Sequence, residues 1–391
     1  MIAMRVDMFL TRFAQHQFFF LDATELRIAI FGSLSAAHSR RDVLSRGLLN
    51  AMFLWASRDF MADGFSEEDL LARTVTDIAN DTMLIDSWQR TLQAIQAQVL
   101  LSLYHMDTGR FLEGRYHCAA VTSLAYSTNL HQLGYPSLTG PFPPDFLQHS
   151  LPVDADNAQS AKLIGAFRSI VILNNYWVAA TGAPSNVPSG TMIGAPWLTS
   201  YQVTHLPSVS VVTHNDVSGM SPFALLANAS TFLERTIAFT AQHQGLPHPA
   251  EFAALDARLE TFRASLRIIC DGVGAPRTTQ LCLAIPIFVN AAILQLHAPR
   301  NISSSAALHK CFAAARDVAA LLADARLGDW EHPDPVFGPI LAAFAEFLIG
   351  QLPSGLPSVP AYLSAGKCHA AVQQRYTAAQ VSLGLGVFPQ Q

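Results

Sequence analysis

The sequence predicts an all-α fold, a multi-helix globular domain of stacked helical hairpins. Apolar residues recur at helical spacing along most of the chain, as in the stripe Leu44, Leu48, Ala51 and Trp55. Hydrophobic residues make up 50% of the chain and charged residues only 14%, against a usual charged share of about 25%. A chain this apolar can bury a large core and is not disordered. Strand-like alternation is confined to residues 209–213.

Twelve helices are expected, and local signals fix the start of one of them. Ser66 stands before three acidic residues, which is the pattern of a helix N-cap with an acid, Asp69, at the third position. The carboxylates also favour the positive end of that helix. The expected helices cover residues 5–20, 24–31, 41–58, 67–79, 84–106, 110–131, 158–181, 221–243, 249–272, 277–298, 303–326 and 334–350.

Apolar stripes predict which face of several helices is buried. The helix over 84–106 carries the stripe Ile95, Val99, Leu100 and Leu103. Gly109 allows a tight reversal after it, so the two helices on either side of this glycine form a hairpin. The second helix is expected to pack back through Leu112, Tyr116, Ala119, Ala120 and Leu124. The helix over 303–326 carries the stripe Leu308, Phe312, Ala315, Ala319 and Leu322.

Two stretches, 281–298 and 335–352, have a composition close to that of a membrane span. Pro286 and Asn290 interrupt the first stretch and Glu346 interrupts the second, and both are marginal in length. We therefore expect buried core helices at both places and no membrane partner.

Proline and glycine divide the chain at residues 134–157 and 182–220, because a helix cannot run through prolines at their spacing. The domain is expected to cover residues 1–350 around these loop-rich divisions. Residues 351–391 are expected to form a C-terminal tail, rich in proline and glycine, that is partly disordered or docked on the domain.

The shortage of charge also predicts an exposed apolar patch, since helices of a soluble domain need polar outer faces. The loop that holds Ile193, Pro196 and Trp197 is the candidate interaction surface, because its backbone cannot bury itself as regular structure. We expect this surface to meet another segment of the intact regulator, a second subunit or a coactivator.

No sequence pattern predicts a catalytic, cofactor or metal site, so no enzyme activity is expected. The five cysteines are odd in number and far apart, and they form no zinc-binding pair. Asp77, Asp81 and Asp86 are too widely spaced to chelate magnesium together, and a polar helix end accounts for them. A net charge of −5 gives no broad basic surface for DNA.

Several stretches, in order, resemble the fungal-specific transcription factor domain, the regulatory middle-homology region of zinc binuclear cluster regulators. They are residues 48–57, the hairpin 95–134 that opens with Gln96-Ala97-Gln98, the segment Asn174-Asn175-Tyr176-Trp177 with Gly182-Ala183-Pro184, the loop 193–197, and residues 291–299. The resemblance covers roughly residues 8–350.

This resemblance implies a nuclear regulatory and interaction region that controls transcription by RNA polymerase II. The partners it implies are a second copy of the chain, a coactivator or corepressor, and a small-molecule effector. In that family, zinc and DNA are bound by a six-cysteine cluster, which this sequence lacks, so neither function is assigned to a residue here. The alternatives are an all-α metal-dependent enzyme of isoprenoid-synthase type and a helical scaffold unrelated to transcription.

Overall fold

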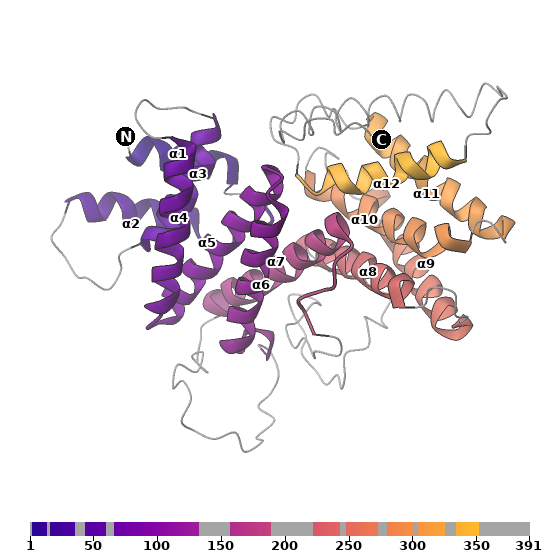
Figure 1. The fold of residues 1–391 in the computed structure, drawn as a ribbon, viewed down its shortest axis with the longest axis horizontal. Helices are drawn as coiled ribbons and strands as arrows, with labels where there is room; N and C mark the ends of the chain where they lie inside the picture. Colours follow the sequence, from indigo (N-terminus) through magenta and orange to yellow (C-terminus); the bar gives the residue numbers. More distant parts are fainter. Residues whose placement is uncertain are drawn as a thin grey trace, which may run out of the picture. The chain divides into compact units, whose positions relative to one another are not determined.

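The computed structural model describes residues 2–13, 16–35, 44–59, 66–132, 157–188, 222–242, 248–272, 280–300, 304–324 and 334–351. Twelve α-helices, two 3-10 helices and no strand lie within this part of the chain (Figure 1). The α-helices are α1 (Ile2–Phe13), α2 (Ala23–Ser35), α3 (Arg46–Asp59), α4 (Glu67–Met83), α5 (Trp88–Asp107), α6 (Phe111–Ser127), α7 (Asn157–Thr181), α8 (Pro222–Gln242), α9 (Pro249–Gly272), α10 (Gln280–His297), α11 (Ser305–Asp324) and α12 (Phe337–Gly350). The prediction of an all-α fold is confirmed, and each expected helix has a counterpart.

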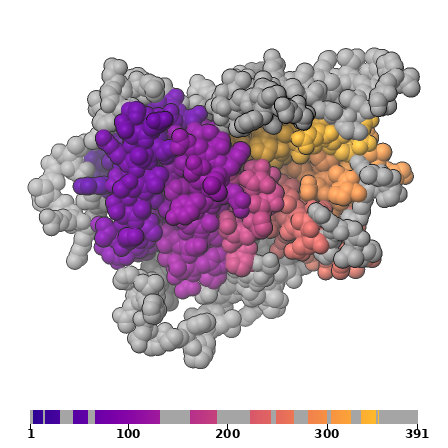
Figure 2. Space-filling model, viewed as in Figure 1, coloured from indigo at the N-terminus to yellow at the C-terminus, as the bar shows by residue number. Residues whose placement is uncertain are grey.

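The chain divides into two compact units. The first holds α1 to α6, apart from residues 107–109, and α7 up to Leu173. The second holds α7 from Asn174 onward and α8 to α12. Figure 2 draws the same view with every atom as a sphere.

Helix α5 is the core of the first unit. Every residue from Ala94 to Met106 is buried, and a helix that is buried on all its faces belongs to the middle of a bundle. Trp55 of α3 donates its indole N–H to the Leu100 carbonyl at 2.9 Å. The reversal after α5 is confirmed, with Gly109 at φ 73°, in the left-handed region that favours glycine.

The first helix is shorter than the expected 5–20, because α1 ends at Phe13. The chain then turns, and the buried amide of Gln96 takes over the backbone hydrogen bonds. Phe20 N donates to Gln96 Oε1 at 3.0 Å, and Gln96 Nε2 donates to the Phe18 carbonyl at 2.8 Å. The sequence prediction was wrong here because a side chain 76 residues away satisfies this backbone instead of a helix.

Helix α3 lies very close to α4 at Gly47. Gly47 N donates to Asp81 Oδ2 at 2.6 Å, and a Cβ on this glycine would lie 2.8 Å from Ile78 Cα. One turn further on, Asn50 Nδ2 donates to Asp77 Oδ2 at 2.7 Å. Two of the three aspartates that we considered for magnesium therefore join two helices.

Helix α10 is the core of the second unit. It contacts α8, α9, α11 and α12, and residues Ile287 to Leu294 are all buried. The expectation of a buried core helix over 281–298 is confirmed. Helix α11 buries a face that is rotated from the expected one and shares only Ala315 with it; the buried residues are Ala307, Cys311, Ala314, Ala315 and Val318. Phe312 is 42% exposed, and its ring contacts that of Phe347.

The segment Asn174 to Trp177 is buried in the second unit. Asn174 Nδ2 donates to Ser185 Oγ at 2.8 Å, and Asn175 Nδ2 donates to Ser230 Oγ of α8 at 3.1 Å. The two amides thus connect α7 to the segment that follows it and to α8. Within the described residues, one window, Lys162–Thr181 of α7, is long and apolar enough to cross a membrane, and 72% of it is buried. A core helix passes the same test.

Candidate functional site

A groove lies between α4 and α6, with the C-terminal end of α5 beneath it. Its volume is about 820 Å³, within the range of roughly 300–1,000 Å³ that is usual for ligand sites. The residues that line it are Glu68, Leu71, Ala72, Val75, His105, Arg110, Leu112, Glu113, Tyr116 and His117, all from the first unit. We call this feature the α4–α6 groove.

The N-termini of both wall helices lie at the same end of the groove. Tyr104, near the end of α5, donates its hydroxyl to the Glu67 carboxylate at the start of α4, so these two helices run antiparallel. Ser102 Oγ of α5 donates to the Gly114 carbonyl of α6 at 2.8 Å across the hairpin. The start of α4 is fixed locally, because Ser66 Oγ accepts from Asp69 N at 3.0 Å, which confirms the predicted cap.

The apolar wall on α6 exists because this helix buries a different face from the expected one. Its buried residues are Gly114, His117, Cys118, Val121, Thr122 and Ala125. Leu112 and Tyr116, which we expected to pack on α5, are 81% and 69% exposed. The prediction was wrong because small residues on the other stripe let α6 approach α5 closely, as the bond from Ser102 to Gly114 shows.

Two stacked histidines form the floor of the groove. The rings of His105 and His117 are 5.5 Å apart between centroids and nearly parallel, at 7°. His117 Nδ1 lies 2.7 Å from Gln98 Oε1, so this ring nitrogen carries the hydrogen. Burial lowers the pKa of each histidine to about 4, and for His117 the neighbouring His105 lowers the pKa further. Both rings are therefore neutral at pH 7.

The rim of the groove carries more negative than positive charge. Glu68 and Glu113 line it as exposed carboxylates, and Arg110 is the cation. Among the residues that the structure describes, no hydrogen bond or ion pair engages the carboxylate of Glu68 or Glu113. Both acids lie in the first turn of a helix, where a negative charge stabilises the helix through its dipole.

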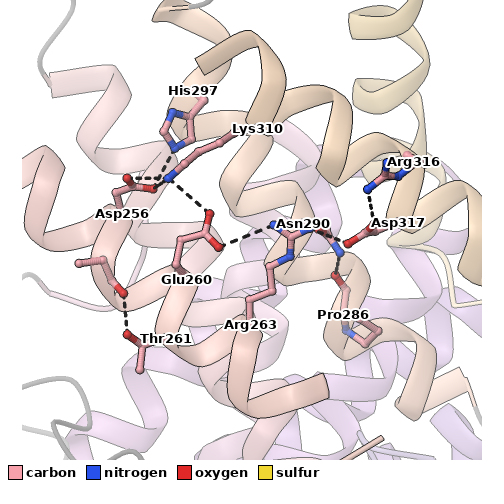
Figure 3. A network of polar contacts seen from close by, with 11 residues as sticks. Asp256, Glu260, Thr261, Arg263, Pro286, Asn290, His297, Lys310, Arg316 and Asp317 are labelled. Atoms are coloured by element: carbon pink, nitrogen blue, oxygen red, sulfur yellow. Dashed lines mark hydrogen bonds and ion pairs between the residues drawn. The ribbon is translucent and has the colours of Figure 1, made fainter. Parts of the chain in front are cut away.

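A second polar cluster joins α9, α10 and α11 in the second unit (Figure 3). Asp256 is at its centre, accepting from Lys310 Nζ at 2.7 Å and lying 3.0 Å from His297 Nε2. Lys310 also pairs with Glu260 at 3.3 Å. Burial would lower the pKa of Lys310, but the two carboxylates outweigh it, and the pKa is raised. Lys310 is therefore fully charged at neutral pH.

His297 is the neutral member of this cluster. Burial lowers its pKa below the ordinary value and outweighs the opposite effect of Asp256. Its contact with a carboxylate requires the tautomer with hydrogen on Nε2. On the next turns, Arg263 pairs with Asp317 at 2.5 Å and with Glu260 at 3.7 Å (Figure 3). The cluster connects three helices through charges that it pairs internally, which is a structural arrangement.

The candidate surface at Ile193, Pro196 and Trp197 lies outside the described residues and stays a prediction. The strand-like alternation at residues 209–213 also lies outside them. Asp86, the third aspartate considered for magnesium, forms an ion pair with Arg90 one turn later, at 3.3 Å. Within the described ranges, no group of three or more His, Cys, Asp or Glu side chains is arranged to hold a metal ion.

Sequence reasoning did not find the α4–α6 groove. The signal that could have found it is a second stripe on α6, Gly114, Cys118, Val121 and Ala125, which competes with Leu112 and Tyr116 for the core. The comparisons add no relative: no protein-family model, no curated protein and no solved structure matches this chain.

Proposed function

We propose that this chain is the regulatory and interaction region of a fungal transcription regulator that acts on RNA polymerase II transcription in the nucleus. The observation that carries the proposal is the ordered set of motifs over roughly residues 8–350. Its longest member, 95–134, includes most of α5 and all of α6.

Several motif residues make hydrogen bonds that connect separate segments of this fold, which supports their interpretation as a family signature. Gln96 binds the backbone around Phe18, and Gln98 binds His117 across the hairpin. Asn174 and Asn175 hold the chain that follows α7 and a neighbouring helix. A polar residue that makes a specific buried hydrogen bond is harder to replace than an apolar residue at helical spacing. An ordered set of such residues therefore supports a shared fold more strongly than apolar spacing does.

In the proposed role the chain does not contact DNA itself. Its charge of −5 disfavours a phosphate backbone, and DNA binding would belong to a zinc cluster that this sequence lacks. The region would instead restrain or license activation by binding protein partners or a small effector. An exposed apolar groove on the first unit is a surface of the kind that such contacts use.

A tethering experiment tests the proposal. The chain is fused to a heterologous DNA-binding domain in a fungal host, and transcription of a reporter with the matching upstream site is measured. We expect reporter transcription to differ from that with the DNA-binding domain alone, and the untethered chain to accumulate in the nucleus. Leu100→Asp, which places a charge at a fully buried position of α5, should abolish the effect.

Reporter transcription equal to that of the DNA-binding domain alone, together with exclusion of the chain from the nucleus, would refute the proposal. A matched surface variant such as Met83→Ser, at a position 86% exposed, controls for nonspecific effects of substitution.

A further inference from the structure

The α4–α6 groove presents apolar side chains to water on both walls. Leu112 and Tyr116 on α6 are 81% and 69% exposed, and Val75 on α4 is 37% exposed. Removing such surface from water is favourable by about 25 cal/mol per Å². Single exposed apolar residues are ordinary, but these converge on one groove with Leu71 and open toward solvent.

The lining residues form one face of each wall helix. On α4 the lining residues are Glu68, Leu71, Ala72 and Val75, which follow the i, i+3, i+4, i+7 rule of one helix face. On α6, Leu112 and Tyr116 are one turn apart. Two helices that lie side by side with their N-termini at the same end leave a furrow, and a third helix packs into such a furrow by placing its own i and i+4 side chains there.

The length of the furrow sets the size of the occupant. Seven residues separate Glu68 from Val75 on α4, and at 1.5 Å per residue they span about 10 Å. That distance accommodates about two turns of helix, hence an apolar stripe of the form i, i+4, i+7.

The negative charge of the rim favours an occupant that carries positive charge. Glu68 and Glu113 stand at the N-terminal end of the groove without ion-pair partners among the described residues, and Arg110 offsets only one of them. Both acids stabilise the N-terminal ends of their helices, but this role does not explain why exposed apolar side chains lie between them. A partner with lysine or arginine beside its apolar stripe would neutralise both carboxylates.

We propose that the α4–α6 groove docks an amphipathic helix of a partner protein that carries basic residues next to its apolar stripe. This rests on the proposed function in that the docked helix belongs to a coactivator or corepressor. The groove is open along the side where Leu112 and Tyr116 are exposed, whereas a small-molecule site encloses most of its ligand. The geometry therefore favours a helix over a small effector.

The experiment selects helices from a display library against the purified full chain. Library peptides are roughly 15 residues long, about the length at which an isolated helix begins to be stable. They carry apolar residues at i, i+4 and i+7, and lysine or glutamate in random combination at the flanking positions. We expect the recovered peptides to be enriched in lysine. Selection against the charge-reversed variant with Glu68→Lys and Glu113→Lys should enrich glutamate instead.

One recovered peptide is then measured by fluorescence anisotropy against single variants. Leu112→Ser and Tyr116→Ser should each weaken its binding by about tenfold or more, as expected for an anchor residue. Met83→Ser, on α4 outside the groove and 86% exposed, is the matched control and should leave binding unchanged. Exposed positions are chosen so that the variants fold, which circular dichroism confirms.

Three outcomes would overturn the inference: recovery of no peptide, recovery without preference for lysine, or binding that Leu112→Ser leaves unchanged. Binding of the dye 1-anilinonaphthalene-8-sulfonate to the wild-type groove, lost in Leu112→Ser and not displaced by any helix, would assign the groove to a small apolar ligand instead. The tethered reporter is read separately. A silent reporter with intact peptide binding would remove the transcriptional role and leave the groove in place.

Discussion

Replacing Gly47 by alanine tests the close approach of α3 and α4. An alanine Cβ at this position would lie 2.7 Å from Asp81 Oδ2, 2.8 Å from Ile78 Cα and 2.9 Å from Ile78 Cγ1. Carbon atoms in contact are normally about 3.5–4.0 Å apart. One of the close atoms belongs to the backbone of α4, so it can give way only if the two helices move apart.

The expected magnitude follows from three effects. Overpacking of this kind costs about 1–3 kcal/mol. Displacing Asp81 also weakens its hydrogen bond with Gly47 N at 2.6 Å, and bonds to charged groups contribute about 1.5–3 kcal/mol when intact. Alanine gains at most about 1 kcal/mol over glycine in a helix. Because the bond to Asp81 is weakened and not lost, that loss and the gain from alanine roughly cancel, and overpacking sets the net change. We therefore expect Gly47→Ala to destabilise the first unit by about 1–3 kcal/mol, which lowers Tm by roughly 3–10 °C.

Urea and thermal unfolding of the full chain, followed by circular dichroism, measure this change. Two other helical glycines are matched controls. Gly338 is the second residue of α12, as Gly47 is of α3, and a Cβ there meets no atom within 4 Å. At Gly165 the nearest contact would be an ordinary 3.5 Å. Alanine at either control should stabilise by up to about 1 kcal/mol, and a Gly47→Ala protein as stable as wild type would refute the reasoning.

Three further predictions concern polar side chains that connect separate segments of the fold. Gln96→Leu leaves the Phe18 carbonyl and the Phe20 N–H without their partner, so unfolding in urea should show a loss of about 2–4 kcal/mol; retention of wild-type stability would show that these two hydrogen bonds contribute little. The folded-state pKa values near 4 of His105 and His117 lie below 6.5, so the unfolded chain binds more protons between these values. Stability should fall as pH decreases from 7 to 5, by about 2 kcal/mol per histidine, and a His117→Gln variant should show a shallower pH dependence of the free energy of unfolding. Asp256→Ala strips Lys310 and His297 of their shared acceptor and should destabilise the second unit by about 1–3 kcal/mol, measured by thermal unfolding, whereas an unchanged Tm would show that the cluster contributes little.

Local signals carried the fold prediction. The cap at Ser66 and the turn at Gly109 depend on residues next to them in sequence, and both were found from sequence. The stripe of α5 was also found, because a helix buried on every face tolerates any choice of stripe. The existence and order of the helices therefore followed from apolar periodicity together with these local signals.

Choosing the buried face failed where two stripes compete on one helix. On α6 and α11 the bulky residues, such as Leu112 and Phe312, face outward, and small ones such as Gly114 and Cys311 face the core. Bulk favours burial, but close approach between helices favours small residues, and the neighbouring helix decides between them. The second stripe on α6 could have indicated that Leu112 and Tyr116 face outward, but the groove itself is lined by residues of three helices, so that stripe does not predict the whole groove.

The two hydrogen bonds between Gln96 and the backbone around Phe18 and Phe20 have a consequence for the order of folding during synthesis. They join Gln96 to backbone groups 76 and 78 residues away, and contacts this distant in sequence raise contact order and slow folding. At about 5–20 residues per second, the ribosome needs roughly 4–15 s after Phe20 to reach this glutamine. The segment that follows α1 must wait through that interval with its backbone bonded to water. A nascent chain stalled before residue 96 should therefore expose α1 and its neighbours to proteases and chaperones.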